Sequence, residues 1–184
     1  PLLQCEKTEI WARPVSPYAS NGVGMLFLPE VDDEVVLQFI NEDPCHPVII
    51  GSLYSRKRKT PVSLDPKNNL KTIVTKNQLK ITLDDDKKII TIRTPGENTL
   101  ILDDDKKQIL LSDANKNKVC MDKNGIMVES GKDLIFKARG NVKTEGMGIE
   151  SKSKQDTKIN GLNIEDSAQM GVKAVSYTHL TLPT

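Results

Sequence analysis

The chain has 184 residues, of which 37% are hydrophobic, only 4% aromatic and 28% charged, with a formal net charge of +1. The length allows one or two domains, and the scarcity of aromatic residues argues against a thick globular core. No apolar run approaches the roughly 18 residues of a membrane-spanning helix, and the first residues lack the apolar core of a signal peptide. Because Pro1 is not an initiator residue, we expect the chain to begin inside a longer protein.

Charge is distributed unevenly along the chain. Residues 1–54 carry 2 basic and 8 acidic residues (2 − 8 = −6), whereas residues 55–184 carry 24 basic and 17 acidic ones (24 − 17 = +7). This shift predicts a boundary near residues 55–70. The basic run Arg56-Lys57-Arg58-Lys59 lies there and could bind nucleic acid or an acidic surface. Because no aromatic stacking residues accompany it, we interpret it as a solvated linker.

Residues 8–54 are typical of a small antiparallel β domain. Short apolar runs are separated by Asn21-Gly22, by the acidic turn 30–34 and by the proline-bounded loop 41–47. Several short strands at even spacing favour a small barrel. The expected strands are 8–15, 24–29, 35–40 and 48–54.

Residues 79–128 repeat with a period of 19. Asp84 and Asp103 each open an Asp-Asp-Asp-Lys-Lys block (103 − 84 = 19), and Met121 lies 19 residues after Leu102. Each repeat holds two runs rich in Ile, Leu and Thr, separated by turn-forming residues. Two short strands cannot bury a face alone, so the repeats must stack on each other, on copies from other chains, or both. A further strand is expected at 71–75.

Beyond residue 128 the expected strands become short and polar. They are 134–136, 141–144, 148–151, 157–159, 162–165 and 168–174. Side chains alternate between the two faces of a strand, and the residues predicted to point inward are Val142, Thr144, Ile149, Ser151, Ile159, Ile164, Met170 and Val172. Residues 175–184 carry no charged residue and break the pattern, so we expect a foreign or disordered tail.

This polar region is unsuited to a wide single-chain β-helix. Three chains wound around one axis need only a thin line of small or branched apolar residues from each. Such a closed prism has no free sheet edge. The sequence therefore predicts an all-β fold in which a small barrel is followed by an elongated triple-stranded β-helix or β-prism, formed by a homotrimer and mechanically stiff.

Few residues are candidates for catalysis or metal binding. Consecutive side chains point apart, so Cys45 and His46 are not expected to form a nucleophilic pair, and the other histidine, His179, lies in the tail. The triplets 84–86 and 103–105 lack the spacing of a calcium loop, and 113–117 begins such a loop without its Gly and final Glu. We therefore expect solvated turns, with no catalytic, metal or cofactor site.

The cysteines Cys5, Cys45 and Cys120 are odd in number and widely spaced. This pattern argues against a disulfide framework and against a zinc site. We expect three small thiols, buried or half-buried, in a reducing compartment.

Five segments of the first domain occur in an order that resembles a known family. They are Trp11–Arg13, Ser16–Met25, Leu28–Val36, Asp43–Val48 and Gly51–Tyr54. Together they resemble the OB-fold of VgrG spike proteins, which belong to type VI secretion and related contractile injection systems and are kin to phage baseplate spikes. The Lys-rich repeats with Gly and Asn corners extend the resemblance to about residue 174.

The resemblance implies a homotrimer whose OB domain forms a collar and whose C-terminal prism forms a needle. It implies as partners a tube of Hcp-like rings, a PAAR tip or effector proteins at the C-terminal end, and a target cell membrane, with no nucleic acid. Such a spike is assembled in the bacterial cytoplasm and then secreted or injected into the target cell, where it punctures the membrane as a structural protein rather than an enzyme.

The resemblance also suggests a division of the chain. We predict an N-terminally truncated OB-fold at 1–57, a linker at 58–78, the needle at 79–174 and the tail at 175–184. The hub domain that contacts the tube is absent, so this fragment is not expected to dock on a tube unaided. The family usually has Gly where Asp32 stands, and Asp tolerates the same turn conformation.

Other functions remain open from the sequence. A phage tail baseplate spike would share these features. A carbohydrate-active β-helix enzyme would need a groove with clustered acids. A nucleic-acid-binding OB module is disfavoured because residues 1–54 are acidic, and phosphate binding requires a basic surface.

Overall fold

The computed structural model describes residues 10–164. The chain divides into two units between Ile135 and Phe136, and each is considered separately. The described residues hold twelve β-strands, one short 3-10 turn, η1 (Ile40–Glu42), and no α-helix. The predicted all-β fold class is therefore confirmed. None of the described residues forms a helix long and apolar enough to cross a membrane.

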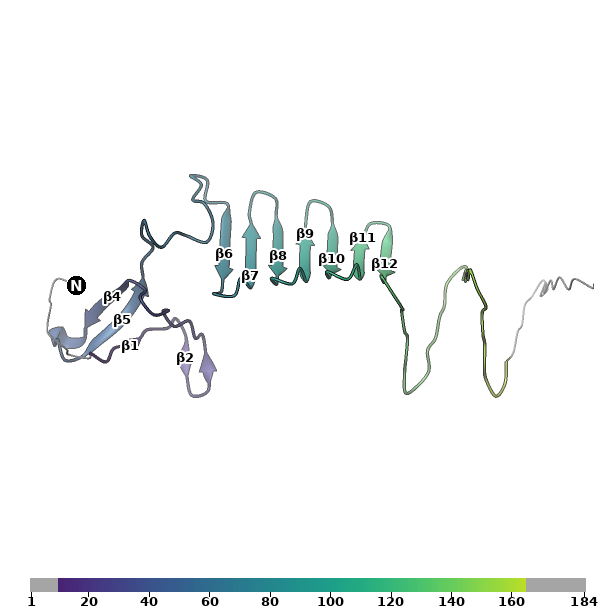
Figure 1. Ribbon diagram of the computed structural model, residues 1–184, viewed down its shortest axis with the longest axis horizontal. Coiled ribbons are helices and arrows are strands. Elements are labelled where there is room, and N and C mark those ends of the chain that lie inside the picture. Colours follow the sequence, from purple (N-terminus) through teal and green to yellow (C-terminus); the bar gives the residue numbers. More distant parts are fainter. Residues whose placement is uncertain (1–9, 165–184) are drawn as a thin grey trace, which may run out of the picture. The chain divides into compact units, whose positions relative to one another are not determined.

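The N-terminal part of the first unit holds a three-stranded sheet and a small hairpin (Figure 1). β5 (Pro47–Ser52) pairs in antiparallel fashion with β4 (Val35–Phe39) and in parallel with β1 (Arg13–Pro14). The hairpin joins β2 (Ala19–Ser20) to β3 (Val23–Gly24) through the predicted Asn21-Gly22 turn, where Gly22 has φ +73°.

Two predictions for this part were wrong in extent. Of the expected strand 8–15, the described residues form only the two-residue β1. The expected strand 24–29 is limited to Gly24, at the end of β3. Met25 donates its N–H to the carbonyl of Tyr18 at 2.9 Å, and Ser16 Oγ donates to the carbonyl of Met25 at 2.7 Å. Local loop contacts thus use the backbone groups that a longer strand would need.

The acidic turn before β4 forms as predicted. Asp33 donates its N–H to the carbonyl of Glu30 at 3.0 Å, and the Asp33 carboxylate accepts the N–H of Glu30 at 2.8 Å. Asp32 has φ +68°. The expectation that Asp adopts the conformation usually taken by Gly is therefore confirmed, because its short polar side chain tolerates the left-handed region.

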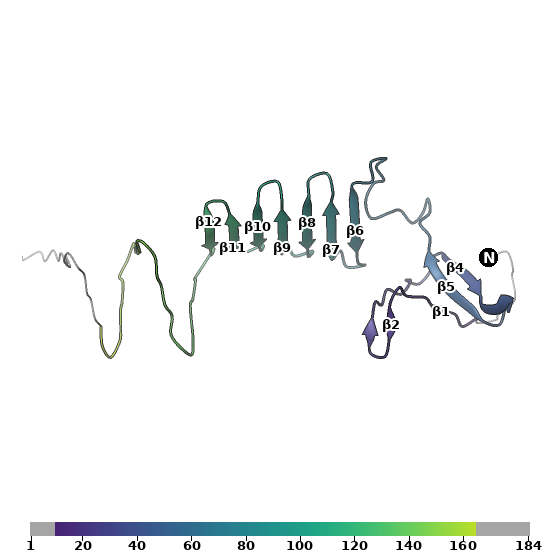
Figure 2. The same ribbon diagram turned by 180° about the vertical axis from the view of Figure 1, so that it is seen from behind.

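Seven strands of the repeat region form one antiparallel meander, which we call the ladder. Every strand pairs with its sequence neighbours, so chain order and spatial order coincide (Figures 1 and 2). The strands are β6 (Leu70–Val74), β7 (Lys80–Asp84), β8 (Ile89–Arg93), β9 (Thr99–Asp103), β10 (Gln108–Ser112), β11 (Lys118–Asp122) and β12 (Gly125–Glu129).

The 19-residue period corresponds to two strands and two different turns. Five-residue turns at 75–79, 94–98 and 113–117 form one edge of the ladder, and four-residue turns at 85–88 and 104–107 form the other. Each five-residue turn is closed by the same two backbone hydrogen bonds. Residues in the left-handed region recur at the same spacing and are Gln78, Glu97 and Lys116 on one edge and Lys88 and Lys107 on the other.

The period ends at the last hairpin. Only Lys123 and Asn124 separate β11 from β12, so β12 begins two residues earlier than the repeat would place it. Ser130 Oγ and the N–H of Gly131 then donate to the side-chain oxygen of Asn117 at 3.0 and 3.2 Å. This contact ties the chain leaving β12 to the five-residue turn at 113–117.

The strands expected beyond residue 130 do not form within the single chain. The described residues from 131 to 164 contain no strand. The apolar residues that were predicted to point inward, Val142, Ile149, Ile159 and Ile164, are exposed. A backbone forms a strand only when a second one pairs with it, and no strand pairing to this segment is found among residues 10–164. Met170 and Val172 lie outside the described residues.

Candidate assembly interface

The two faces of the ladder can be read directly from its strand register. Residues opposite each other on paired strands point to the same face, and neighbours along one strand point to opposite faces. Ile81 of β7 pairs with Ile73 of β6 and with Ile92 of β8. Leu83 of β7 pairs with Ile90 of β8 on that same face. Following these pairs across all seven strands gives two continuous rows.

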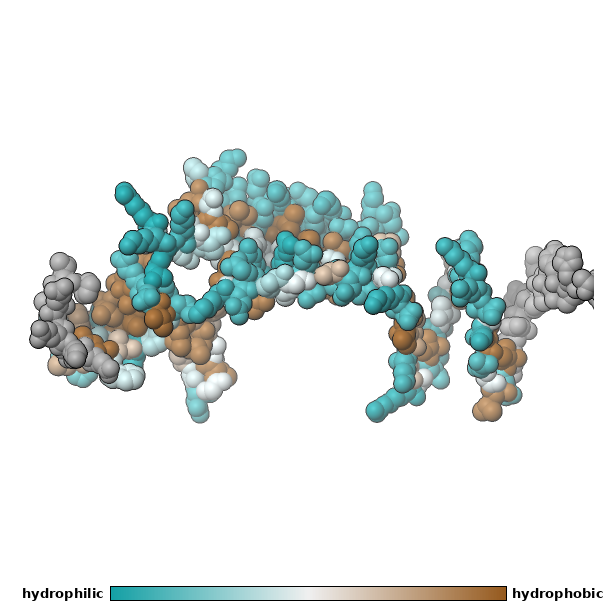
Figure 3. Space-filling view, viewed as in Figure 1, coloured by the Kyte–Doolittle hydropathy of each residue, from teal (hydrophilic) through white to brown (hydrophobic). Residues whose placement is uncertain are grey.

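The face defined by these rows is almost entirely apolar, and we call it the apolar face. Lys71 is its one charged member. The other thirteen residues are Ile73, Ile81, Leu83, Ile90, Ile92, Leu100, Leu102, Ile109, Leu111, Val119, Met121, Ile126 and Val128. Brown apolar surface is visible among the teal hydrophilic turns over β6–β12 (Figure 3).

The opposite face is mixed, and we call it the polar face. Its central row runs through Thr72, Thr82 and Thr91 before turning apolar at Ile101. The hydroxyl of Thr72 donates to the carbonyl of Ile81 at 3.0 Å. The charged side chains of the polar face are Lys80, Asp84, Arg93, Asp103, Lys118, Asp122 and Glu129.

Most of the apolar face is open to water in the single chain. Eleven of its apolar side chains are 38–71% exposed, and only Leu100 and Val119 are half-buried. Covering the exposed part of one such aliphatic side chain contributes ~1 kcal/mol. Monomeric proteins rarely leave a contiguous apolar surface of this kind uncovered. The sheet is therefore built to pack against another apolar surface.

Lys71 sits on the apolar face at β6, the first strand of the ladder. Its ammonium group donates to the carbonyl of Asn68 at 2.7 Å and forms an ion pair with Asp85. A charged residue on an edge strand discourages pairing with a further strand. Lys71 thus marks where the apolar face ends.

The two aspartate triplets end β7 and β9 and continue into turns, as the sequence predicts, but Asp103 is buried and not solvated as expected. Asp84 Oδ1 accepts the N–H of Lys87 at 3.0 Å, and Asp103 Oδ1 accepts the N–H of Lys106 at 2.9 Å. The Asp103 side chain is only 3% exposed and lies 3.1 Å from Lys106 Nζ. The backbone hydrogen bond from Lys106, followed by its ammonium group, holds the pKa of Asp103 below the ordinary value.

The loop at 113–117 is organised by one carboxylate. Asp113 accepts the backbone N–H groups of Asn115 and Asn117 at 2.8 and 2.9 Å, and also their side-chain amides. These bonds, led by the one from the Asn117 backbone, lower the pKa of Asp113. Within residues 10–164, no three His, Cys, Asp or Glu residues are placed to hold a metal ion.

His46 lies in an exposed loop beside Asp43. Its Nδ1 lies 3.0 Å from Asp43 Oδ2, and the other oxygen of Asp43 accepts the N–H of Cys45 at 2.9 Å. Cys45 is exposed, so the expectation of a buried or half-buried thiol was wrong at this position. The proline-bounded loop turns Cys45 outward instead of packing it. His179 and Cys5 lie outside the described residues.

Cys120 is a buried thiol on the polar face of the ladder. It is 4% exposed, as expected for a small packed thiol, and Gln108 Nε2 donates to its sulfur at 3.1 Å.

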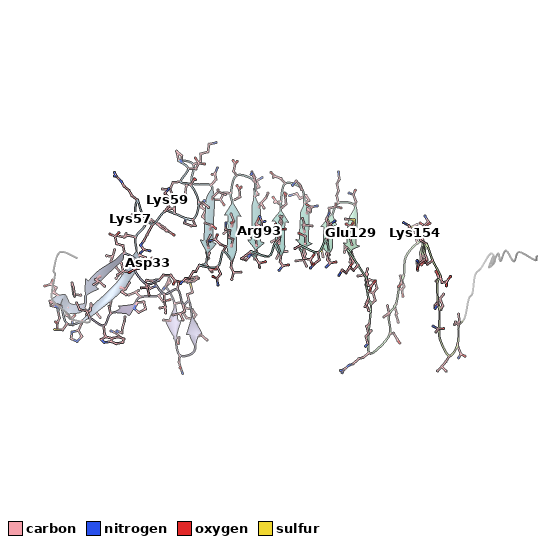
Figure 4. All side chains as sticks on the ribbon, in the orientation of Figure 1. Asp33, Lys57, Lys59, Arg93, Glu129 and Lys154 are labelled. Carbon is pink, nitrogen blue, oxygen red and sulfur yellow. The ribbon has the colours of Figure 1, made fainter. Side chains whose placement is uncertain are left out.

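The basic run at residues 56–59 contributes one ion pair to the first unit, in which Arg58 Nη1 lies 3.0 Å from Asp33 Oδ1. Figure 4 labels this aspartate together with Lys57 and Lys59. One of the four basic side chains is therefore used within the first unit.

The apolar face of the ladder was not predicted from the sequence. Inward-pointing residues were expected only beyond residue 140. The alternation that reveals the face is clear in β7 but hidden in β9 and β10, where Ile101 and Leu110 place aliphatic side chains on the polar face as well. The period of 19 could have revealed it, because the period carries Leu83 onto Leu102 and Met121.

Two family models match the chain in sequence order. Residues 1–54 match the type VI secretion system/phage-baseplate injector OB domain. Residues 88–165 match the phage baseplate V C-terminal trimerisation domain. An injector OB domain followed by a trimerisation domain defines the class of spike and baseplate proteins.

Similar proteins carry names from the same class. The chain is 33% identical over 69 residues to the type VI secretion system spike protein VgrG3 of Vibrio cholerae, a match covering 38% of the chain and 7% of that protein. It is 32% identical over 68 residues to spike protein VgrG4b of Pseudomonas aeruginosa, covering 37% and 8%. A third, the actin cross-linking toxin VgrG1 of Vibrio cholerae, is 30% identical over 69 residues, covering 38% and 6%.

Residues 1–54 and 88–165 are therefore similar to the domains of type VI secretion and phage-baseplate spike proteins, and the chain is similar to VgrG spike proteins, as the resemblance of residues 8–54 implied. The match spans less than a tenth of the length of these relatives. Two of these relatives are named as spike proteins and the third as an actin cross-linking toxin.

Proposed function

We propose that this chain forms the collar and the upper needle of a structural spike in a type VI secretion apparatus. Three copies bring their apolar faces together around one axis, so that thirteen aliphatic side chains from each are withdrawn from water. That exposed apolar face is the observation that carries the proposal. The match of residues 88–165 to a trimerisation domain supports three as the number of copies.

The segment beyond the ladder continues the needle in this proposal. Residues 131–164 have no strand partner within the described part of the chain and expose their apolar side chains. Winding with two other copies would pair the backbone groups and cover those side chains. In this proposal the OB-fold of residues 1–57 is the collar and residues 79–174 belong to the needle, which also takes in β6 (Leu70–Val74) from the predicted linker 58–78.

The remaining proposed partners would bind the full-length spike protein and not this segment alone. We infer that a hub domain joins the spike to a tube of Hcp-like rings, and that the far end carries a PAAR tip or an effector. The spike is assembled in the bacterial cytoplasm and driven through the target cell membrane, with no catalysis by this segment. A phage-type baseplate spike is the second candidate, because the matching OB family covers both machines.

Secretion of the whole protein tests the proposal. In a bacterium with a working type VI apparatus, the protein should reach the culture medium. Ile92→Asp, which places a charge on the apolar face, should abolish secretion and leave monomeric protein in the cells. Thr91→Asp is the matched control on the polar face and should be secreted. Equal secretion of both variants would refute the proposal, and recovery only within phage-like particles would favour the second candidate.

A further inference from the structure

The two edges of the ladder carry opposite net charge. The aspartate edge comprises residues 84–89, 103–108 and 122–125, with five basic and seven acidic residues, so 5 − 7 = −2. The lysine edge comprises residues 74–80, 93–99, 112–118 and 129, with five basic and three acidic residues, so 5 − 3 = +2. Figure 4 labels Arg93 and Glu129 of the lysine edge.

Some charged side chains on the two edges form no ion pair within the described residues. On the aspartate edge, four of the five lysines pair with aspartates of the same edge. Asp86, Asp122 and Lys123 of this edge are in no ion pair within residues 10–164, and on the lysine edge the same holds for Lys80, Lys116, Lys118, Asp113 and Glu129. The charges outside ion pairs thus sum to 1 − 2 = −1 on the aspartate edge and 3 − 2 = +1 on the lysine edge.

We propose that neighbouring copies meet edge to edge, the aspartate edge of one against the lysine edge of the next. This inference rests on the proposed trimer and specifies how its copies are oriented. In the proposed trimer, each ladder forms one wall of a prism, and its strands are stacked along the prism axis. Three-fold rotation about that axis brings the aspartate edge of each copy against the lysine edge of the next copy at every corner. Turning one copy end for end would instead bring like edges together, which places like charges in contact.

The strand register also sets which charges meet. Lys80 begins β7, and Asp86 lies in the turn that follows β7, so both lie at the same level of the ladder. Lys118 begins β11 and Asp122 ends it. Copies related by rotation without a shift along the axis therefore place Asp86 beside Lys80 of a second copy, and Asp122 beside Lys118 of a second copy. The free charges fix both the polarity and the register of the assembly.

Charge reversal in the full chain tests this arrangement. Lys80→Glu with Lys118→Glu makes both edges acidic and should lower the trimerisation constant at least roughly tenfold, because exposed pairs are altered at all three corners. Asp86→Lys with Asp122→Lys should weaken the trimer similarly. Combining all four substitutions restores opposite edges and should restore the trimer. Lys57→Glu with Lys59→Glu is the control, with the same change in net charge outside the ladder.

The possible results separate this inference from the proposed function. Sedimentation velocity at low and high salt measures the trimer fraction, and the loss in the two double variants should shrink at high salt. If the wild type is trimeric and the double variants trimerise equally well, the edge pairing alone is overturned. The same holds if the variant with all four substitutions loses as much trimer as the two double variants together. A wild type that does not trimerise would overturn the edge pairing and the proposed function together.

Discussion

Asp84 and Asp103 lie on either side of Ile89, each directly opposite it on a neighbouring strand. Both carboxylates accept the N–H of the residue three positions further along and so begin equivalent turns. The sequence repeat is thereby a structural repeat, in which one aspartate for every two strands closes a turn. These turns hold the strands at the spacing that makes the apolar face continuous.

The buried carboxylate of Asp103 predicts a pH dependence of stability. Its pKa in the folded chain lies below the ordinary value of 3.8 because Lys106 donates to it. Its contribution is therefore complete above pH 3.8 and is lost as the pH falls through the lower, folded-state pKa. Asp103→Asn should be less stable than the wild type at pH 7, and the difference should shrink as the pH falls below 3.8. Denaturant unfolding across this range measures it. A constant difference would contradict the assignment.

Lys88 occupies a left-handed backbone position that suits glycine better. Its φ is +52°, whereas the adjacent Lys87 is not among the positive-φ residues. Both lysines make only long ion pairs, at 3.7 and 3.9 Å. Lys88→Gly should therefore be more stable than Lys87→Gly by ~1 kcal/mol per chain. Denaturant unfolding at one fixed protein concentration compares them, and equal stabilities would show that the turn carries no strain.

Gly131 is held where the chain leaves the ladder. A Cβ at this position would lie 2.4 Å from the backbone carbonyl oxygen of Asn115. Gly131→Ala should cost about 1–3 kcal/mol per chain because the crowded atom belongs to the backbone and cannot rotate away. Gly96→Ala is the control, since a Cβ there meets nothing within 4 Å. Thermal unfolding compares the melting temperatures of the two variants. Equal losses in both would argue against the close approach of Gly131 to the Asn115 carbonyl.

Much of the ladder could be predicted from the sequence. The Ile, Leu and Thr runs and the repeated Asp-Asp-Asp-Lys-Lys blocks locate β7 to β10 to within a residue or two. The family of the first domain could be inferred from motifs such as Asn21-Gly22, which form the turns expected of them. Periodicity and turn chemistry are local properties, and a single sequence displays them directly.

Other features depend on geometry that the sequence does not display. Lys88 and Glu97 take positive φ although neither is a usual left-handed residue, because the fixed length of each turn requires one such position. The strand expected at 24–29 is cut short by the contacts of Ser16 and Met25. The strands expected beyond residue 130 need backbone partners that residues 10–164 of one chain do not provide.

The mass of the chain in solution tests the central claim most directly. Light scattering on the purified chain should give three times 20.4 kDa, and the value should hold on dilution through the micromolar range. A stable, well-folded species of 20.4 kDa would contradict the account, because the eleven exposed apolar side chains of the apolar face would then remain in water with nothing to cover them.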